Sequence, residues 1–97
     1  MPFVLGQNLL GRSSIGFPRS ENKIFKATVN ETFKMVVLKN HVSVDVDLFE
    51  YEIEGQDFSL VYDDYDLAKF SAVTVEGDDL VVKLYNSIIA STDQLNN

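Results

Sequence analysis

The side chains that could carry acid–base chemistry begin with a single histidine. His41 is the only imidazole in the chain, and Asp45 and Asp47 follow it closely. General acid–base catalysis requires a partner within hydrogen-bond reach of the ring, and a nucleophile would have to lie beside that pair. No nucleophile, base and orienting group can be placed together by spacing. We therefore predict no catalytic residue and a protein that is not an enzyme.

Two acidic connections offer the oxygen ligands that Ca²⁺ prefers. The ion takes about six to eight oxygens, so two such turns that converge could hold it. The Asp-x-Asp-x-Asp-Gly loop with its later glutamate is absent, however, and a solvated turn explains the same composition. We predict no metal ligand, and calcium binding stays an alternative that spacing alone does not decide. The carboxylates concerned are Asp63, Asp64, Asp66, Glu76, Asp78 and Asp79.

Three glycines near the N-terminus, Gly6, Gly11 and Gly16, recur at regular spacing. A nucleotide-binding loop needs a strand before it and a helix N-terminus after it, so that backbone amides point at the phosphates. The spacing here matches no such fingerprint, and no Gly-Lys-Ser or Gly-Lys-Thr follows. We predict no cofactor and assign the glycines to flexible or closely approached backbone.

Composition limits the setting of the protein. The 97 residues, 45% hydrophobic and without cysteine, suffice for one domain with a modest core and exclude disulfide scaffolds and thiolate sites. The N-terminus has no basic segment before an uninterrupted apolar run, so no signal peptide is predicted. No run reaches the roughly 18 apolar residues of a membrane span. We expect an intracellular or virion protein, not secreted by a signal peptide, with no membrane partner.

Charge is divided sharply along the chain. Residues 1–44 carry six Lys or Arg and two Glu, whereas residues 45–97 carry two Lys and thirteen Asp or Glu, for a net charge of −7. Binding to duplex nucleic acid depends on neutralising phosphates with basic side chains, so this acidity argues against a nucleic-acid partner. A charge asymmetry of this kind instead favours association with another protein. We expect a protein partner.

Turn signals every eight to twelve residues or so separate runs rich in β-branched and aromatic residues. This spacing indicates antiparallel strands, and no long helix is predicted. We therefore predict an all-β fold, a small antiparallel sandwich or barrel of about six or seven strands. Its strands would lie within residues 24–29, 33–38, 42–54, 58–62, 73–75 and 80–85. The turn composition of residues 54–57 predicts one hairpin, and that of residues 76–79 predicts a second hairpin over residues 73–85.

The clearest alternation lies in residues 42–54. Up to Leu48 the even-numbered residues are apolar, and from Phe49 onward the odd-numbered ones are. Such a change of phase requires either one long strand bent by a β-bulge or two strands that meet at a corner. We favour the bent strand because no Gly, Pro or Asn interrupts the run. Its carboxylates would then form an exposed acidic face: Asp45, Asp47, Glu50, Glu52 and Glu54.

Residues 1–22 differ from the rest. Glycine, serine and proline are frequent there, and neither a helical period nor sustained alternation is present. We interpret the segment as an extended N-terminal arm, followed by a β domain over residues 23–97. The apolar side chains of this arm are too numerous for a free linker, so the arm either adds a strand to its own sheet or lies on a partner. We favour contact with a partner. These partner-binding residues are Phe3, Val4, Leu5, Leu9, Leu10, Ile15 and Phe17.

Together these features predict a non-enzymatic structural or assembly module. Its arm would dock on a second copy in a homo-oligomer or on a larger complex, as in viral (phage) capsid, tail or cement components. The acidic face has two interpretations, since charged strands also discourage edge-to-edge aggregation. If it instead binds a basic surface, the alternative function is an acidic inhibitor protein that occupies the basic groove of a nucleic-acid-binding enzyme.

Overall fold

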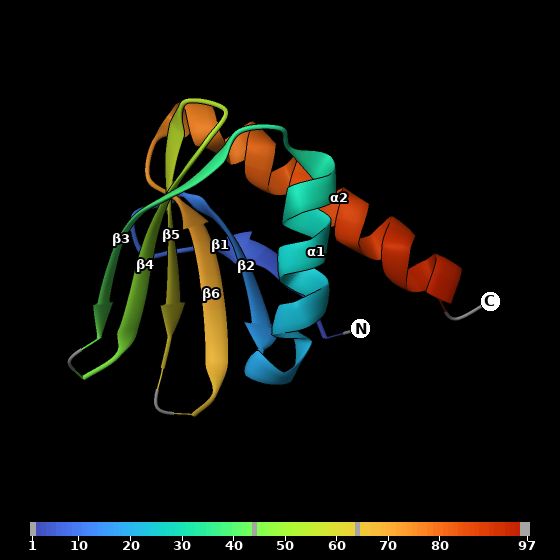
Figure 1. Ribbon diagram of the computed structural model, residues 1–97, viewed down its shortest axis with the longest axis horizontal. Helices are drawn as coiled ribbons and strands as arrows, with labels where there is room; N and C mark the ends of the chain where they lie inside the picture. The colour runs from blue at the N-terminus through green and yellow to red at the C-terminus, as the bar shows by residue number, and fades with distance from the viewer. Residues whose placement is uncertain (1, 44, 64, 96–97) are drawn as a thin grey trace.

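The computed structural model describes residues 2–43, 45–63 and 65–95, with side chains described as far as Thr92 (Figure 1). Val44 and Asp64, which belong to the predicted alternation and to an acidic connection, lie outside the described residues. The elements in chain order are β1 (Val4–Gln7), β2 (Ser13–Pro18), a 3₁₀ turn (Arg19–Glu21), α1 (Asn22–Thr32), β3 (Val36–Ser43), β4 (Asp47–Ile53), β5 (Gln56–Tyr62), β6 (Leu67–Ala72), a second 3₁₀ turn (Val75–Gly77) and α2 (Asp78–Leu95).

All six strands belong to one antiparallel sheet in the order β1-β2-β6-β5-β4-β3. Strands β3 to β6 form a meander of consecutive hairpins, and the N-terminal hairpin of β1 and β2 is added beside β6. Helix α1 follows β2 and leads the chain to β3. This strand forms the edge of the sheet that is farthest from the helices (Figure 1). β1 and β3 are therefore the two edge strands of the described sheet.

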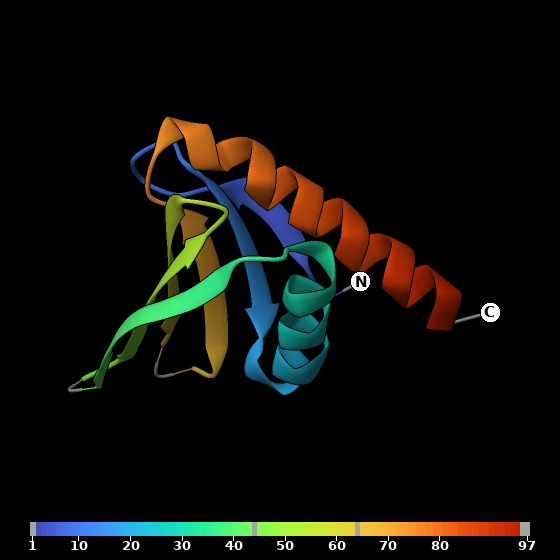
Figure 2. The ribbon, with the colours of Figure 1, turned by 45° about the horizontal axis from the view of Figure 1, so that its top comes forward.

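Both helices pack against the same face of the sheet, and the buried side chains form a single cluster. The ring of Phe25 in α1 stacks on Phe17 of β2, with centroids 4.6 Å apart, and lies 5.2 Å from the ring of Phe70 in β6. Helix α2, which runs diagonally along the sheet in Figure 2, contributes Val81 and Leu84, both fully buried. No helix of the described residues covers the other face, which we call the open face.

The predicted all-β sandwich or barrel is confirmed only in part. The sheet is antiparallel and has six strands, as expected, but it is open and two helices accompany it. The second hairpin predicted at residues 73–85 is wrong, because α2 occupies most of that segment. Val81, Leu84 and Ile88 recur at intervals of three and four residues, so one side of a helix buries all of them.

No helix among the described residues is long and apolar enough to cross a membrane.

The strand predicted at residues 24–29 is also wrong, because these residues belong to α1. Ile24, Phe25 and Val29 are residue types with high β-propensity. This propensity reflects how well such side chains pack on a half-buried surface more than an intrinsic preference of the backbone for the extended conformation. In the structure Phe25, Thr28 and Val29 are buried against the sheet, and their spacing suits a helix. The Thr28 hydroxyl donates to the Ile24 carbonyl at 2.8 Å, so its polar atom is satisfied within the helix.

Residues 1–22 do not form an extended arm separate from residues 23–97. Residues 4–18 fold into the β1–β2 hairpin, and β2 pairs with β6 over five residues from Ser14 to Pro18. Phe3, Ile15 and Phe17 are almost fully buried in the core. Some consecutive residues of β2, which point to opposite faces of the sheet, are both buried, so the strand lacks clean alternation. For this reason the sequence pattern did not predict a strand there.

The long bent strand predicted at residues 42–54 is two strands. β3 ends at Ser43 and β4 begins at Asp47, and the two pair as a hairpin in which Val42 lies opposite Leu48. The change of phase lies after this reversal and within β4, where Leu48 is on the open face and Phe49 is on the helix-covered face. The β-bulge in this hairpin lies elsewhere, where the register shifts between Leu38 and Asn40.

Candidate functional site

The tip of the N-terminal hairpin presents two leucines to solvent. Leu9 is fully exposed and Leu10 is 83% exposed, although neither is charged or polar. A single exposed leucine is common on protein surfaces, but adjacent leucines at the tip of a loop place a continuous apolar area in water. Val4 and Leu5 in the preceding strand are 64% and 36% exposed. Four of the apolar side chains predicted to contact a partner are therefore exposed on this hairpin.

Hydrogen bonds hold this tip in one conformation. The Asn8 Oδ1 atom accepts from the backbone N–H groups of Leu10 and Arg12, at 3.0 and 2.9 Å. The Asn8 N–H donates to the Arg12 carbonyl at 2.9 Å, which closes the hairpin. Gly11 adopts a φ of 80°, a conformation that glycine enters without steric cost. The leucines are thus displayed by an ordered turn.

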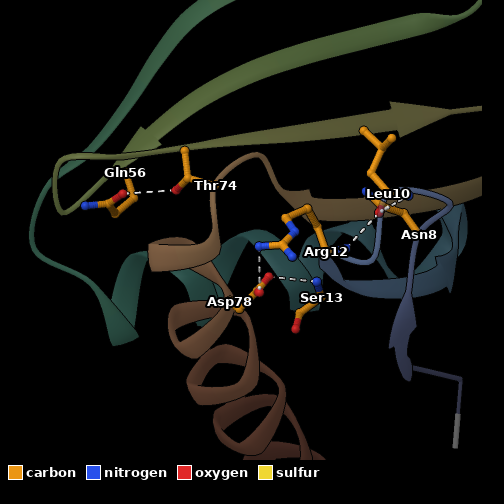
Figure 3. Close-up of polar contacts among 7 residues, drawn as sticks. All are labelled: Asn8, Leu10, Arg12, Ser13, Gln56, Thr74 and Asp78. Carbon is orange, nitrogen blue, oxygen red and sulfur yellow. Dashed lines mark hydrogen bonds and ion pairs between the residues drawn. The ribbon is translucent and has the colours of Figure 1, made fainter.

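A second set of contacts fixes the base of the tip to helix α2 (Figure 3). The Asp78 Oδ1 atom accepts from the Ser13 N–H at 2.8 Å, and its Oδ2 atom lies 3.2 Å from Arg12 Nη1. Arg12 Nη1 is buried and makes no hydrogen bond of good geometry. Arg12 and Asp78 therefore attract each other mainly through their opposite charges. Asp78 is in the first turn of α2, where a carboxylate is favoured by the helix dipole. The start of β2 and the start of α2 are therefore joined.

The open face next to this hairpin is hollowed and largely apolar. Cross-strand pairing places one row of side chains across all six strands, from Val4 to Val42. A hollow of about 670 Å³ lies beside β1, and its lining includes Pro2, Val4 and Leu67. The complete row, in strand order, is Val4, Gly16, Lys69, Val61, Leu48 and Val42.

The five residues of the predicted acidic face are separated in the structure. Glu50 and Glu52 lie on the open face of β4, and Asp45 lies in the connection before that strand. Asp47 lies on the helix-covered face at the start of β4, opposite Tyr62. Glu54 is in the β4–β5 turn with a φ of 53°, and its Oε1 atom accepts from a backbone N–H of residue 34 at 3.0 Å. Only two members therefore form part of one acidic surface.

A polar cluster lies at the end of the sheet beside the β3–β4 hairpin, and the sequence indicated His41 and Asp47 as neighbours but not the other members. His41 Nε2 lies 3.3 Å from Asp47 Oδ1, and the imidazole stacks on Phe49 with centroids 4.0 Å apart. Arg19 Nη2 lies 3.7 Å from Asp47 Oδ2, and its guanidinium lies over the Tyr62 ring at 4.8 Å. Hydrogen bonds from Ser43 and His41 hold the pKa of Asp47 below its usual value of 3.8.

A small hollow borders this polar cluster. It has a volume of about 240 Å³ and is lined by Arg19, Asp47 and Tyr62 among others. Within the described ranges, no three His, Cys, Asp or Glu side chains are grouped so that they could hold a metal ion. Arg19 neutralises part of the carboxylate charge, and His41 is half exposed with a ring held by stacking. These contacts hold the Asp47 carboxylate between the first 3₁₀ turn and the β3–β4 hairpin.

Of the seven predicted partner-binding residues, the structure leaves four available at the surface. Val4, Leu5, Leu9 and Leu10 are exposed on the hairpin, whereas the other three belong to the core. The sequence contained one signal that separates them. The exposed leucines lie between Asn8 and Gly11, a turn composition, whereas the buried residues flank that turn.

No protein-family model matches this chain, and comparisons with curated proteins and with solved structures find no significant match.

Proposed function

We propose that this protein is a non-enzymatic assembly or interaction module that contacts its partner through the β1–β2 hairpin. The observation that carries the proposal is the exposed apolar surface of that hairpin, above all the two leucines at its ordered tip. The contact region is thus a folded hairpin and not the extended arm expected from the sequence. A role in a virion or another large assembly stays part of this proposal.

The physical support is that an ordered tip binds at a lower entropic cost than a flexible one. Buried apolar side chains contribute about 1.5–3 kcal/mol each when they leave water, and Leu9 and Leu10 make little use of this within the chain. The open face beside the hairpin is also unoccupied by any described element. A second layer over that face, which would complete the predicted sandwich, would have to come from the partner.

A pair of matched variants tests the hairpin. In one, the exposed residues Leu5, Leu9 and Leu10 are changed to serine. In the other, the exposed residues Val37, Leu38 and Val42 on the opposite edge strand are changed to serine. The native complex is isolated from the source cells and sized by light scattering. We expect the first variant to be absent from this complex and the second variant to be present in it. Equal retention of both variants would contradict the proposal.

A second candidate function rests on the carboxylates of the open face. Glu52 lies opposite Asp57 on β5, and Glu50 is the next open-face residue along β4. These three carboxylates form an acidic patch, in which Asp57 accepts a hydrogen bond from Lys39 Nζ, and this patch could occupy a basic groove. The protein would then be an acidic inhibitor of a nucleic-acid-binding enzyme, with electrostatic steering that raises the association rate.

Charge reversal separates the two candidates. A Glu50→Lys/Glu52→Lys variant should lose inhibition of purified nucleases and polymerases by at least about tenfold if the patch binds them. The control, Glu31→Lys/Glu76→Lys, changes the net charge equally at exposed residues outside the sheet. Loss of inhibition in both variants would indicate a general charge effect, and no inhibition by the unmodified protein would remove the inhibitor hypothesis.

A further inference from the structure

We propose that the partner of the hairpin is a second copy of this chain, which pairs its own β1 with β1 of the first across a two-fold axis. This inference rests on the proposed function, because it names the partner of the same hairpin. The site is the outer edge of β1, residues Val4–Gln7, which no other described strand pairs.

The edge of β1 has none of the features that usually prevent strand addition. It contains Val4, Leu5, Gly6 and Gln7, with no charged side chain, no proline and no register shift. Natural sheets protect exposed edges with lysines, prolines, bulges or a covering segment. An unprotected edge of this kind accepts another extended strand through backbone hydrogen bonds.

Charge favours a second copy at this edge over other surfaces of the molecule. Each chain carries a net charge of −7, so two copies repel one another wherever their acidic surfaces meet. Residues 1–18 contain no Asp or Glu, and their one charged side chain, Arg12, is paired with Asp78. Strand β1 itself therefore brings no carboxylate to the contact, and Asp63 contributes one to the lining of the hollow beside it.

The geometry of an antiparallel pair suits two identical edges. A two-fold axis normal to the sheet makes the two β1 strands antiparallel and keeps both pairs of helices on one side of the combined sheet. An axis at Leu5 places this residue opposite Leu5 of the partner subunit. Val4 then lies opposite Gly6 of the partner subunit. Both edges contribute the same residues, so one surface is complementary to itself.

The strand that would pair is already held in its extended conformation. Phe3, just before β1, is 1% exposed, and its ring lies 5.3 Å from that of Phe17. The Asn8 turn fixes the other end of the strand. Little conformational entropy is therefore lost on pairing. The hollow beside β1 in each copy would lie on the same face of the combined sheet, one on each side of the axis.

The first experiment compares two lysine variants of the complete, purified chain. Gly6 and Asn40 lie at opposite ends of one cross-strand row on the open face, and a Cβ atom at Gly6 meets no heavy atom within 4 Å. Gly6→Lys and Asn40→Lys change the net charge equally. A four-residue contact is small, so we expect a weak dimer and measure mass by sedimentation from about 10 µM to 1 mM.

We expect the unmodified chain to approach twice its 10.9 kDa mass as concentration rises. Gly6→Lys brings two ammonium groups together near the axis and should weaken dimerisation by about tenfold or more. Asn40→Lys should dimerise like the unmodified chain. The inference is overturned if the unmodified chain keeps its single-chain mass throughout, or if Asn40→Lys weakens the dimer as strongly as Gly6→Lys.

The second experiment uses the absence of cysteine from the chain. Leu5→Cys should form a disulfide-linked dimer under mild oxidation, since residues opposite each other across paired strands lie close together. Val37→Cys, at an exposed site on the other edge strand, is the control and should stay single. Cross-linking of Val37→Cys alone would overturn the inference.

These results separate the inference from the proposed function. A chain that is monomeric when purified, yet loses its native complex when the hairpin leucines are replaced, overturns only the second copy as partner. If the native complex retains the hairpin variant as well as it retains the unmodified chain, the proposed function itself is contradicted.

Discussion

The two edge strands of the sheet differ in how they meet solvent. β3 is eight residues long, contains a register shift, and carries Lys39, whose Nζ atom donates to Asp57 Oδ1 at 3.1 Å. This hydrogen bond with Asp57 raises the pKa of Lys39 above its usual value of 10.5, so the charge persists at that edge. β1 is four residues long, regular and uncharged.

The edges differ again in how they are attached to the rest of the molecule. Seven of the eight β3 residues are exposed, and the strand has few neighbours besides β4. The β1 edge is anchored by buried aromatic rings on one side and by the Asn8 and Asp78 contacts on the other. The long edge thus carries two of the features that discourage strand addition, a lysine and a register shift, whereas the short edge carries neither.

Removing a ring beneath the β1–β2 hairpin gives the largest expected effect. Phe17→Ala should lower the free energy of unfolding by about 3–5 kcal/mol, because Phe17 is buried between Phe3 and Phe25. Val37→Ala on β3, at a side chain 49% exposed, should change it by less than about 0.5 kcal/mol. Urea denaturation followed by circular dichroism measures both. Similar losses in the two variants would mean that the hairpin is no better anchored than β3.

Removing the contact between the hairpin and α2 has an intermediate effect. Asp78→Ala leaves the Ser13 N–H without its acceptor and Arg12 without its counterion, which should cost about 1–3 kcal/mol. Asp79→Ala is the matched control, since both carboxylates are in the first turn of α2 but Asp79 is exposed. Hydrogen exchange at the Ser13 amide should accelerate only in Asp78→Ala. An unchanged exchange rate would show that the tip is held by the Asn8 turn alone.

Removing the charged side chain of Lys39 tests whether it limits self-association at the β3 edge. Lys39→Thr removes the charged side chain at the register shift and its contact with Asp57 while leaving the folded core intact. We expect a small increase in self-association at high concentration, measured by light scattering, and an unchanged urea midpoint. Lys34→Thr, at an exposed residue before β3, is the control. If Lys39→Thr associates no more than Lys34→Thr, the register shift alone protects this edge.

The smallest expected effect is a change in titration at the end of the β3–β4 hairpin. The pKa of Asp47 is held below 3.8 by hydrogen bonds from Ser43 and His41 and by the nearby charge of Arg19. A carboxyl group with a lowered folded-state pKa contributes stability that is present above its unfolded-state pKa and lost as pH falls through the folded-state pKa. The loss therefore occurs below about pH 4.

An NMR titration of the Asp47 carboxyl carbon checks this assignment. Ser43→Ala should raise the pKa of Asp47 toward 3.8, because it removes the hydrogen bond that lowers it most. Ser59→Ala, on the open face of β5, should leave the titration of Asp47 unchanged. A curve for Ser43→Ala that overlays that of the unmodified protein would assign the shift to His41 and Arg19.

Several local features could be predicted because they depend on near neighbours in sequence. The strand at residues 58–62 lies within β5, and the turn at residues 54–57 reverses the chain as its composition indicates. The spacing of Val81, Leu84 and Ile88 also contained the helical period of α2. It was interpreted as a hairpin because Asp78 and Gly77 have turn composition and Val81 and Val82 have β-propensity.

The sequence by itself determined strand β5, the antiparallel character of the sheet, the division of charge, and the apolar content of residues 1–22. Only the tertiary structure decided which of those apolar residues form the core. Phe17 and Leu9 are both large and apolar, yet Phe17 is buried and Leu9 is fully exposed. Burial depends on which face of the sheet a side chain takes and whether a helix covers it, and pairing of β2 with the distant strand β6 sets both. That pairing joins residues about 55 positions apart, beyond the range over which local patterns carry information.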